Sequence, residues 1–190
     1  MLTVRRTAAA AVAVVGFAAG PALTAHATAG PPAGAHLAQA PADITDAEFL
    51  ALAARGNRFE IVTGRQAVRR GQSALVRRLG RQFVRHHTAA LQQGAAVAAK
   101  LGIPVPQDLD AAQQATVTRL SRVPRRRFDA AWLRTQRAAH VTSVELHVRG
   151  ALTGDSPDVR TLATLALPVV AVHLGELTVA AQGHEDHDDH

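Results

Sequence analysis

The segment SALVRRLGRQFVRHHTAALQQGAAVAAKLG, residues 73–102, decides the fold of this chain. Ser73 is a typical helix N-cap and Gly102 a typical C-terminal stop, so the segment predicts a single helix. Its apolar positions recur at intervals of three and four, the period of a helix with one buried face. The buried stripe is expected to contain Val76, Leu79, Phe83, His87, Ala90, Gly94, Val97 and Leu101. One histidine therefore lies among residues that should form the core.

Three other long stretches show the same period, and each is bounded by cap or breaker residues. Thr45 and Glu48 predict a capping box at the start of the first, and Pro168 is expected to kink the last. The expected helices are 45–70, 73–101, 110–121, 125–152 and 157–181. Alternation with a period of two, the sign of strands, is nearly absent. The predicted fold class is all-α, a four-helix bundle with one extra short helix in the long connection between helices 2 and 3. Its core should include Phe83, Trp132 and Val169.

Each of the four long helices carries an ionisable residue on its apolar stripe. These residues are Glu60, His87, His140 and His173. Counted from the expected helix ends, they lie at similar heights, within about one turn or roughly 6 Å. We expect the four side chains to meet near the middle of the bundle. Glu176, one turn beyond His173, is expected on nearly the same face.

Imidazole and carboxylate groups are ligands for Zn, Cu, Mn or non-haem Fe, so this set predicts one transition metal ion between the helices. Glu176 would be a fifth ligand or an acceptor that orients the His173 ring. A di-iron centre is not expected, because it needs Glu-x-x-His motifs on two helices, whereas His173-x-x-Glu176 occurs once and reversed. The alternative is a structural network without metal, in which the buried polar groups bind one another.

A second candidate metal site lies in the tail, residues 183–190. Its histidines, His184, His187 and His190, alternate with Asp and Glu. Such a tract binds transition ions with little selectivity, and the alternative is a solvated end that aids solubility.

The N-terminus predicts export. Arg5 and Arg6 precede an apolar run over residues 8–19, and Ala25-His26-Ala27 fits a cleavage site. A retained membrane anchor is the alternative, but the run is shorter than the roughly 20 residues that span a bilayer. The expected organisation is a signal peptide 1–27, an Ala/Gly/Pro-rich flexible linker 28–44, a bundle domain 45–182 and the tail 183–190. The protein is then periplasmic, in the cell envelope or extracellular in a bacterium. The chain has no Cys, which excludes disulfides and thiolate ligands.

The chain is basic, with 21 Lys and Arg, 15 Asp and Glu, and a net charge of +6. Arg77, Arg81 and Arg85 repeat every four residues and so line one helix face. An anionic cell-wall polymer, a lipid headgroup surface or the protein's own acidic tail would suit such a face, and plain solvation is the alternative. No aromatic interleaving or motif indicates a nucleic acid partner. Phosphate-binding loops, serine nucleophile elbows and His-Glu-x-x-His motifs are missing, so a non-catalytic role is expected.

Several elements occur in an order that resembles a known family. They are Asp46-Ala47-Glu48-Phe49, Glu60 with Gly64, Phe83-Val84-Arg85-His86-His87-Thr88, Phe128-Asp129-Ala130-Ala131-Trp132, His140, and Leu167-Pro168 with His173. The chain is similar over residues 45–181 to exported bacterial domains of unknown function 4142, regarded as ferritin-like helical bundles. The family positions fall on Glu60, His87, His140 and His173. This chain departs from the family at His86, where an acidic residue is usual, and at Trp132, where Tyr is usual. The resemblance implies a fold and an export route but no established activity.

Overall fold

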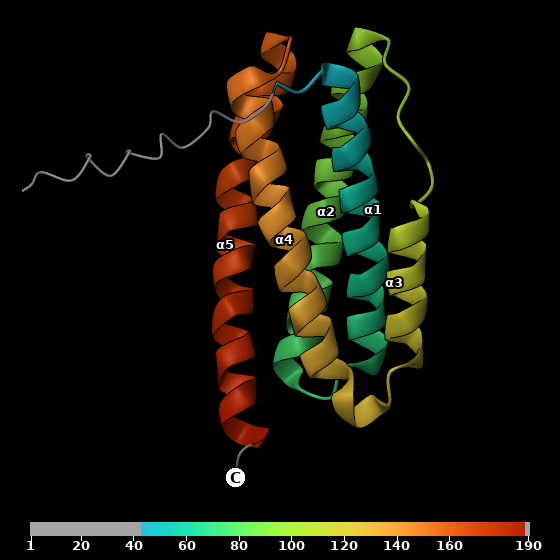
Figure 1. Cartoon of the computed structure of the whole chain (residues 1–190), viewed down its shortest axis with the longest axis vertical. Helices are drawn as coiled ribbons and strands as arrows, with labels where there is room; N and C mark the ends of the chain where they lie inside the picture. Colours follow the sequence, from blue (N-terminus) through green and yellow to red (C-terminus); the bar gives the residue numbers. More distant parts are fainter. Residues whose placement is uncertain (1–42, 189–190) are drawn as a thin grey trace, which may run out of the picture. The chain divides into compact units, whose positions relative to one another are not determined.

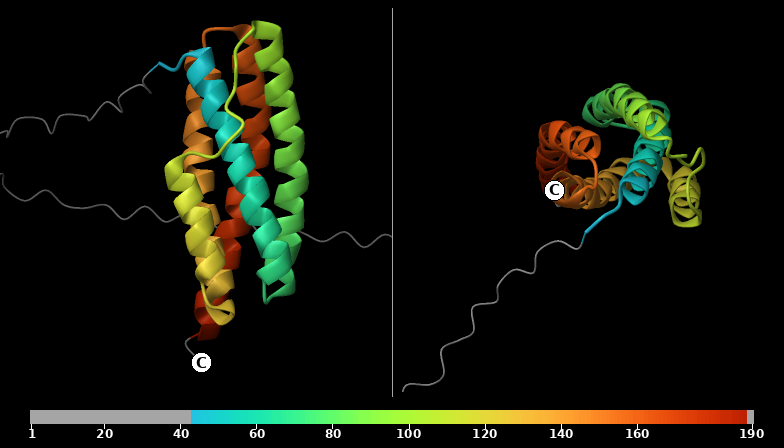
Figure 2. Two further views of the ribbon diagram at one scale, coloured as in Figure 1. Left: turned by 90° about the vertical axis from the view of Figure 1, so that its right-hand side faces the viewer. Right: turned by 90° about the horizontal axis from the view of Figure 1, so that it is seen from above.

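The computed structural model describes residues 43–188, with only the backbone for 184–188, and every regular element in this part is a helix. The elements are α1 (Asp46–Arg70), α2 (Ala74–Leu101), α3 (Ala111–Arg122), the 3-10 turn η1 (Arg125–Arg127), α4 (Phe128–Thr153) and α5 (Pro157–Asp188). Helices α1, α2, α4 and α5 form the bundle, and α3 lies on the outer side of α1 (Figures 1 and 2). The predicted all-α fold with one extra short helix is confirmed. Helix α5 continues beyond the expected end at residue 181. The expected signal peptide, residues 28–42 of the expected linker and the last two tail residues lie outside the described residues, whereas Ile44, the last residue of that linker, is buried.

The helix ends follow the cap residues in the sequence. Thr45 Oγ1 accepts from the Glu48 backbone N–H at 3.2 Å, and Gly102 ends α2 in the left-handed conformation with φ 67°. The complete capping box occurs at α3, where Asp110 and Gln113 each bind the other's backbone N–H. Short polar side chains thus fix where α1 and α3 begin, whereas α4 starts after Arg127 without a side-chain cap.

The α1–α2 hairpin turns through Gly71, Gln72 and Ser73. Ser73 caps α2 by accepting from Val76 N at 3.1 Å, and Arg77 Nη1 donates to the carbonyls of Gly71 and Gln72 at 2.9 and 2.6 Å. The α4–α5 hairpin has the same turn. It comprises Gly154, Asp155, Ser156 and Arg160, with matching bonds from Val159 N to Ser156 Oγ and from Arg160 Nη1 to Gly154 O and Asp155 O.

Each of these turns is closed by an aspartate from the other hairpin. Asp129, in the first turn of α4, accepts from Gln72 N at 2.8 Å and from Ser73 N at 2.7 Å. Asp46, in the first turn of α1, accepts from Ser156 N with both carboxylate oxygens at 3.1 Å. The two hairpins are therefore joined at both ends of the bundle by bonds from a carboxylate to backbone N–H groups of a turn.

The apolar core is divided into two clusters. One is made of Ala67, Val76, Leu79, Phe83, Leu120, Phe128, Trp132, Leu133, Leu177 and Ala180. The other is made of Ile44, Phe49, Leu50, Ala98, Val159 and Ala163. Along α1, α2 and α5, buried ionisable residues lie between the stretches that feed the two clusters. A buried polar layer therefore crosses the bundle between two apolar halves.

One predicted core position is wrong. Phe83 and Trp132 are fully buried, as predicted, but Val169 is 44% exposed, and Val170 is buried in its place. Both valines fit a helical stripe that contains His173. Val159 and Ala163, which are fully buried, set the stripe one residue further round the helix.

Within the described residues, one segment, Pro157–Gly183 of α5, is long and apolar enough to cross a membrane by length and composition alone. Core helices of soluble proteins share that property. Only 22% of its most apolar window is buried in the bundle. Residues 161–175 of this segment contain no Asp, Glu, Lys or Arg, so the exposed surface of α5 is uncharged along this stretch.

Candidate metal centre

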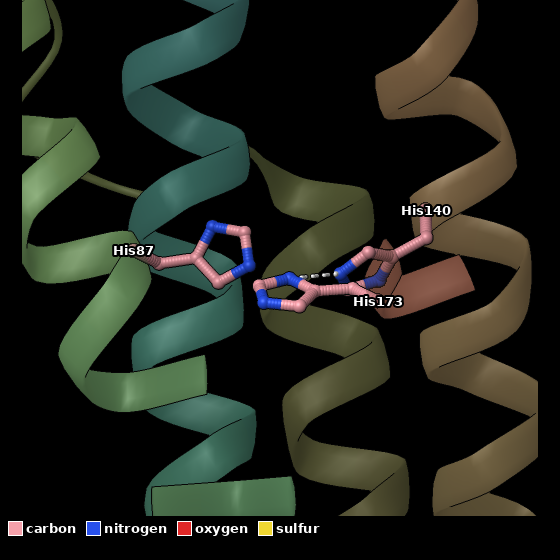
Figure 3. Close-up of side chains that lie close together, drawn as sticks. All are labelled: His87, His140 and His173. Carbon is pink, nitrogen blue, oxygen red and sulfur yellow. Dashed lines mark hydrogen bonds between the residues drawn. The ribbon is translucent and has the colours of Figure 1, made fainter. Parts of the chain in front are cut away.

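Three histidines from three helices converge inside the polar layer. His87 on α2, His140 on α4 and His173 on α5 each offer one ring nitrogen, and these atoms all lie within 4.8 Å of one another. Figure 3 shows the three rings close together between the helices. The exposed fraction of each residue is 6%, 1% and 1%, respectively. The group is therefore shielded from solvent, as the sequence predicted for these three positions.

Oxygen acceptors fix the hydrogen positions of two of the rings. His140 Nδ1 lies 2.9 Å from the Gln136 carbonyl oxygen, and His87 Nδ1 lies 2.8 Å from Asn57 Oδ1. Because these oxygens can only accept, Nδ1 carries the hydrogen in both rings and donates it. The Nε2 atom of each neutral ring is left with a free lone pair. In His87 this atom is buried and has no hydrogen-bond partner.

His173 links the buried cluster to the surface. Its Nδ1 lies 3.3 Å from His140 Nε2, and its Nε2 lies 2.9 Å from Nδ1 of His86, an exposed residue. Since His140 Nε2 accepts, His173 Nδ1 donates to it and His86 Nδ1 donates to His173 Nε2. One directed chain of hydrogen bonds thus runs from His86 through His173 and His140 to the Gln136 carbonyl.

Glu60 lies beside the triad, and its protonation state is coupled to the orientation of the Gln136 amide. Glu60 Oε1 is 3.8 Å from His140 Nδ1, and the Gln136 side-chain oxygen faces the Glu60 carboxyl group. Gln136 Nε2 donates to Thr63 Oγ1 at 2.8 Å, while Thr63 Oγ1 donates to Phe59 O at 2.7 Å. A protonated Glu60 completes this set by donating to the Gln136 oxygen. An ionised Glu60 requires the Gln136 amide to turn and donate its N–H instead.

Burial keeps these groups uncharged. Desolvation raises the pKa of Glu60 well above its usual value. Desolvation, followed by repulsion from neighbouring histidines, lowers the pKa of His87 well below 6.5 and that of His173 to about 3. The pKa of His140 is lowered to about 4 by desolvation, which outweighs the opposing bond to Gln136. The imidazoles are therefore neutral near pH 7 and keep their lone pairs.

The Phe83 ring packs against all three histidine rings. Its ring centroid lies 4.9 Å from that of His140, 4.7 Å from that of His173 and 6.0 Å from that of His87. Phe83 itself stacks on Trp132 at 5.7 Å, and Trp132 Nε1 donates to Thr63 O at 3.0 Å. Phe83 lies one turn before His87 on α2, and Trp132 lies two turns before His140 on α4. The two stacked rings thus form an aromatic base against which the histidines pack.

Not every predicted residue joins this group. Glu60, His87, His140 and His173 do come together, although Glu60 is not within reach of all three ring nitrogens. The structure does not bring Glu176 into the cluster, because its carboxylate accepts from Gln82 Nε2 at 2.7 Å and lies 3.9 Å from Arg78 Nη1. The tail candidates His184 and His187 have no described side chains, and His190 lies outside the described residues.

Three residues that bind members of the cluster were missed as such, and a fourth residue, the buried His147, lies near the cluster but outside the triad. His86 precedes the buried His87 and was assigned to the flank of the stripe. Gln136 lies on the predicted stripe of α4, one turn before His140, and this spacing was the available signal. Asn57 lies one turn before Glu60 but off the stripe. His147 is 8% exposed and binds Ser143 O through Nδ1 at 2.7 Å, two turns from His140.

Two cavities reach the histidines. A cavity of about 710 Å³ lies against α2 and α5 and is lined by His86, His87 and His147, with Val169 and Val170 among its apolar walls. A second, of about 410 Å³, touches Glu60, His87 and His140 from the side of α1 and α4. Small solutes therefore have room to approach the triad. Three neutral nitrogens and one further donor can form the four-coordinate site that Zn or Cu takes in proteins.

Comparison with solved structures reveals the same fold elsewhere. The crystal structure of a DUF305 fragment from Deinococcus radiodurans has a TM-score of 0.65 and 16% identity, covering 75% of this chain and 99% of that chain. CopM in the Cu(II)-bound form has a TM-score of 0.64 and 14% identity, with the same coverage. At these identities the likeness concerns the fold alone. No curated protein matches the sequence. The model of a family described as "Domain of unknown function (DUF4142)" matches residues 31–178, well over half of the chain, so the protein belongs to the DUF4142 family.

Proposed function

We propose that the protein binds one transition metal ion through His87, His140 and His173. The observation that carries this proposal is the convergence of three neutral ring nitrogens from three helices within 4.8 Å, one of them buried without a partner. The proposed role is that of an exported, non-catalytic metal-binding protein of the cell envelope. The sequence pattern of residues 1–27 supports export.

The free His87 Nε2 supports a metal site rather than a structural network. A network evolved for stability would pair this atom, because leaving a buried polar atom unpaired costs about 1–3 kcal/mol. His140 and His173 are paired with each other, yet the bond between them is long, at 3.3 Å. A cation between the three rings would satisfy all three nitrogens at once.

The surroundings of the rings support the same proposal. Ligand histidines usually donate their second N–H to an oxygen, which fixes the ring and makes the ligating nitrogen more basic. His87 and His140 both do so, through Asn57 Oδ1 and the Gln136 carbonyl. His173 must move its hydrogen from Nδ1 to Nε2 to ligate through Nδ1, and His86 Nδ1 can accept it there if that ring changes its own hydrogen position.

Glu60 supplies charge compensation. A buried cation favours the ionised form of a nearby carboxyl group, so binding is expected to release the Glu60 proton. Turning the Gln136 amide then lets its nitrogen donate to the carboxylate. Copper is the first ion to test, because divalent first-row ions bind nitrogen sites most tightly at Cu(II). The Cu(II)-bound form of the fold neighbour CopM agrees with that choice.

The test separates the triad from the tail. In the mature chain, His184, His187 and His190 are replaced by Ala to remove tail binding. We expect this protein to retain about one equivalent of Cu(II) after desalting, measured by elemental analysis. His87→Gln or His140→Gln in the same background should abolish retention. His147→Gln is the matched control, because His147 is also buried and bonded through Nδ1 but lies outside the triad.

Circular dichroism of the metal-free variants checks that each one folds. A tail-substituted protein that retains no Cu(II) or Zn(II), or that binds equally well without His87 and His140, would refute the proposal. The polar network would then be the better interpretation of the layer.

A further inference from the structure

Four arginines line one groove on the outer side of the first hairpin. Arg65 and Arg69 on α1 and Arg81 and Arg85 on α2 surround Val68 and Val84 in a groove of about 410 Å³. All four arginines are exposed, whereas the two valines are half-buried. The groove lies apart from the histidine triad, and none of its lining residues belongs to that site.

Two glycines bring these arginines together. A Cβ atom on Gly80 would lie 2.7 Å from the Gly64 carbonyl oxygen, so the backbones of α1 and α2 meet at a distance that only glycine allows. The residue after each glycine is an arginine, Arg65 and Arg81. The same contact that fits the helices together therefore brings like charges close to each other.

Among the side chains that the structure describes, residues 43–183, none supplies a counter-charge for this group. Other arginines of the hairpin have partners: Arg70 donates to the Leu120 and Val123 carbonyls, Arg77 to the turn, and Arg78 faces Glu176. In the part of the chain that the structure describes, Arg65, Arg69, Arg81 and Arg85 form no ion pair or hydrogen bond. Like charges at a spacing of four residues destabilise a helix, so an anionic ligand that neutralised them would remove this cost.

We propose that this groove binds consecutive phosphates of an unbranched phosphodiester polymer, of the alditol phosphate kind. Guanidinium groups bind phosphate oxygens in pairs of parallel hydrogen bonds. The arginines on each helix are one turn apart, about 6 Å along the axis, so they form a row suited to several charges in line. This binding is independent of the metal centre.

The groove itself favours this ligand over two others. Its lining contains no aromatic side chain on which a nucleic acid base could stack. Its apolar residues are half-buried valines, while the exposed large apolar side chains of the described chain, such as Leu165 and Val179, belong to other surfaces. A membrane-binding face would combine protruding apolar groups with the arginines.

The test uses fluorescently labelled poly(glycerol phosphate) and the mature chain. Binding is measured by anisotropy at 50 and 200 mM salt. If four arginines each neutralise one phosphate, affinity should fall about 50-fold over this range, by the relation for single-stranded polyanions. Arg65→Gln with Arg81→Gln should weaken binding at 50 mM salt at least tenfold, and its affinity should then fall only about sevenfold with salt.

The matched control is Arg134→Gln with Arg137→Gln, which removes the same charge from exposed positions of α4. Its affinity should stay within about twofold of the parent. If both double variants bound the polymer equally weakly, the proposed groove site would be refuted, and the polymer would be bound by the overall positive charge of the protein. Binding of inorganic phosphate as tight as that of the polymer would overturn recognition of consecutive phosphates. Binding to phosphatidylglycerol vesicles but not to the free polymer would assign the groove to lipid instead.

Discussion

The two hairpins of this bundle share a turn but differ in the surfaces they present. Gly71, Ser73 and Arg77 of the first correspond to Gly154, Ser156 and Arg160 of the second, at the same spacing. Continuing that correspondence along the outer helices, Arg78, Arg81 and Arg85 of α2 match Thr161, Thr164 and Pro168 of α5. Residues 161–175 of α5 contain no Asp, Glu, Lys or Arg.

This contrast shows which residues hold the fold and which are free to specialise. The turns depend on a glycine, a capping serine, an arginine and an aspartate from the opposite hairpin. The outer faces carry no such constraint, so one is cationic and the other uncharged, with Leu165, Val172 and Val179 at least 60% exposed. The two hairpins also contribute differently to the interior, because the first supplies His87 to the triad and the second supplies His140 and His173.

The largest expected effect is acid destabilisation, dominated by the second hairpin. Folded His140 and His173 have pKa values of about 4 and 3 against 6.5 for an exposed histidine. Below pH 6.5 the unfolded chain therefore binds protons that the folded chain does not, and the free energy of unfolding falls by about 1.4 kcal/mol per pH unit for each such histidine. Glu60 acts in the opposite direction, because its pKa is raised on folding.

Urea unfolding of metal-free protein between pH 6.5 and 4 measures this slope. His173→Asn should reduce the slope by one histidine's share. A slope unchanged by His173→Asn would show that this ring is not held neutral by the fold.

The second effect compares the two aspartates that close the turns. Asp129→Ala removes two bonds of 2.8 and 2.7 Å to two backbone N–H groups, whereas Asp46→Ala removes longer bonds to a single one. Hydrogen bonds to charged groups contribute about 1.5–3 kcal/mol each, so Asp129→Ala should cost about 3–6 kcal/mol and Asp46→Ala about half of that. Urea unfolding at pH 7 gives both values. Equal costs would mean that the turns are closed equally strongly.

The smallest effect concerns the tight helix contact of the first hairpin. Gly80→Ala places a methyl group 2.7 Å from the Gly64 carbonyl oxygen and 2.8 Å from Ala67 Cβ, so backbone must move. Overpacking of this kind costs about 1–3 kcal/mol. Gly94→Ala, in the same helix, meets nothing within 4 Å and should stabilise by up to about 1 kcal/mol. Thermal unfolding of both variants tests the contrast, which fails if Gly80→Ala is neutral.

The sequence predicted the elements well because caps and period are local properties. Ser73, Asp110, Gly102 and Ser156 fix helix ends through bonds to residues only a few positions away. Val169 was assigned to the core because a period of 3.6 cannot separate it from Val170. That choice depends on how α5 rotates against its neighbours, which is a tertiary property.

The candidate site was predicted as far as helix periodicity allows. Three histidines on apolar stripes at equal height were enough to expect their convergence. Glu176 was expected in the cluster but does not join it. Its partner, Gln82, belongs to another helix, and neither this bond nor the rotation of α5 can be deduced from the apolar stripe of α5. His86 and Asn57 flank their stripes, so only the packed structure shows that each binds a ring of the cluster. The likeness of the two hairpins is not evident from the sequence, since few side chains beyond the turns are shared.

The reciprocal placement of Asp46 and Asp129 has a consequence for synthesis on the ribosome. Asp46 is synthesised before the turn that it closes, so its carboxylate is already present when the second hairpin forms. Asp129 is made more than fifty residues after Gln72 and Ser73, and the first hairpin emerges with these two N–H groups uncapped. The earlier half of the domain therefore completes its own turn only when the later half arrives, which couples the maturation of the nascent chain to its C-terminal half.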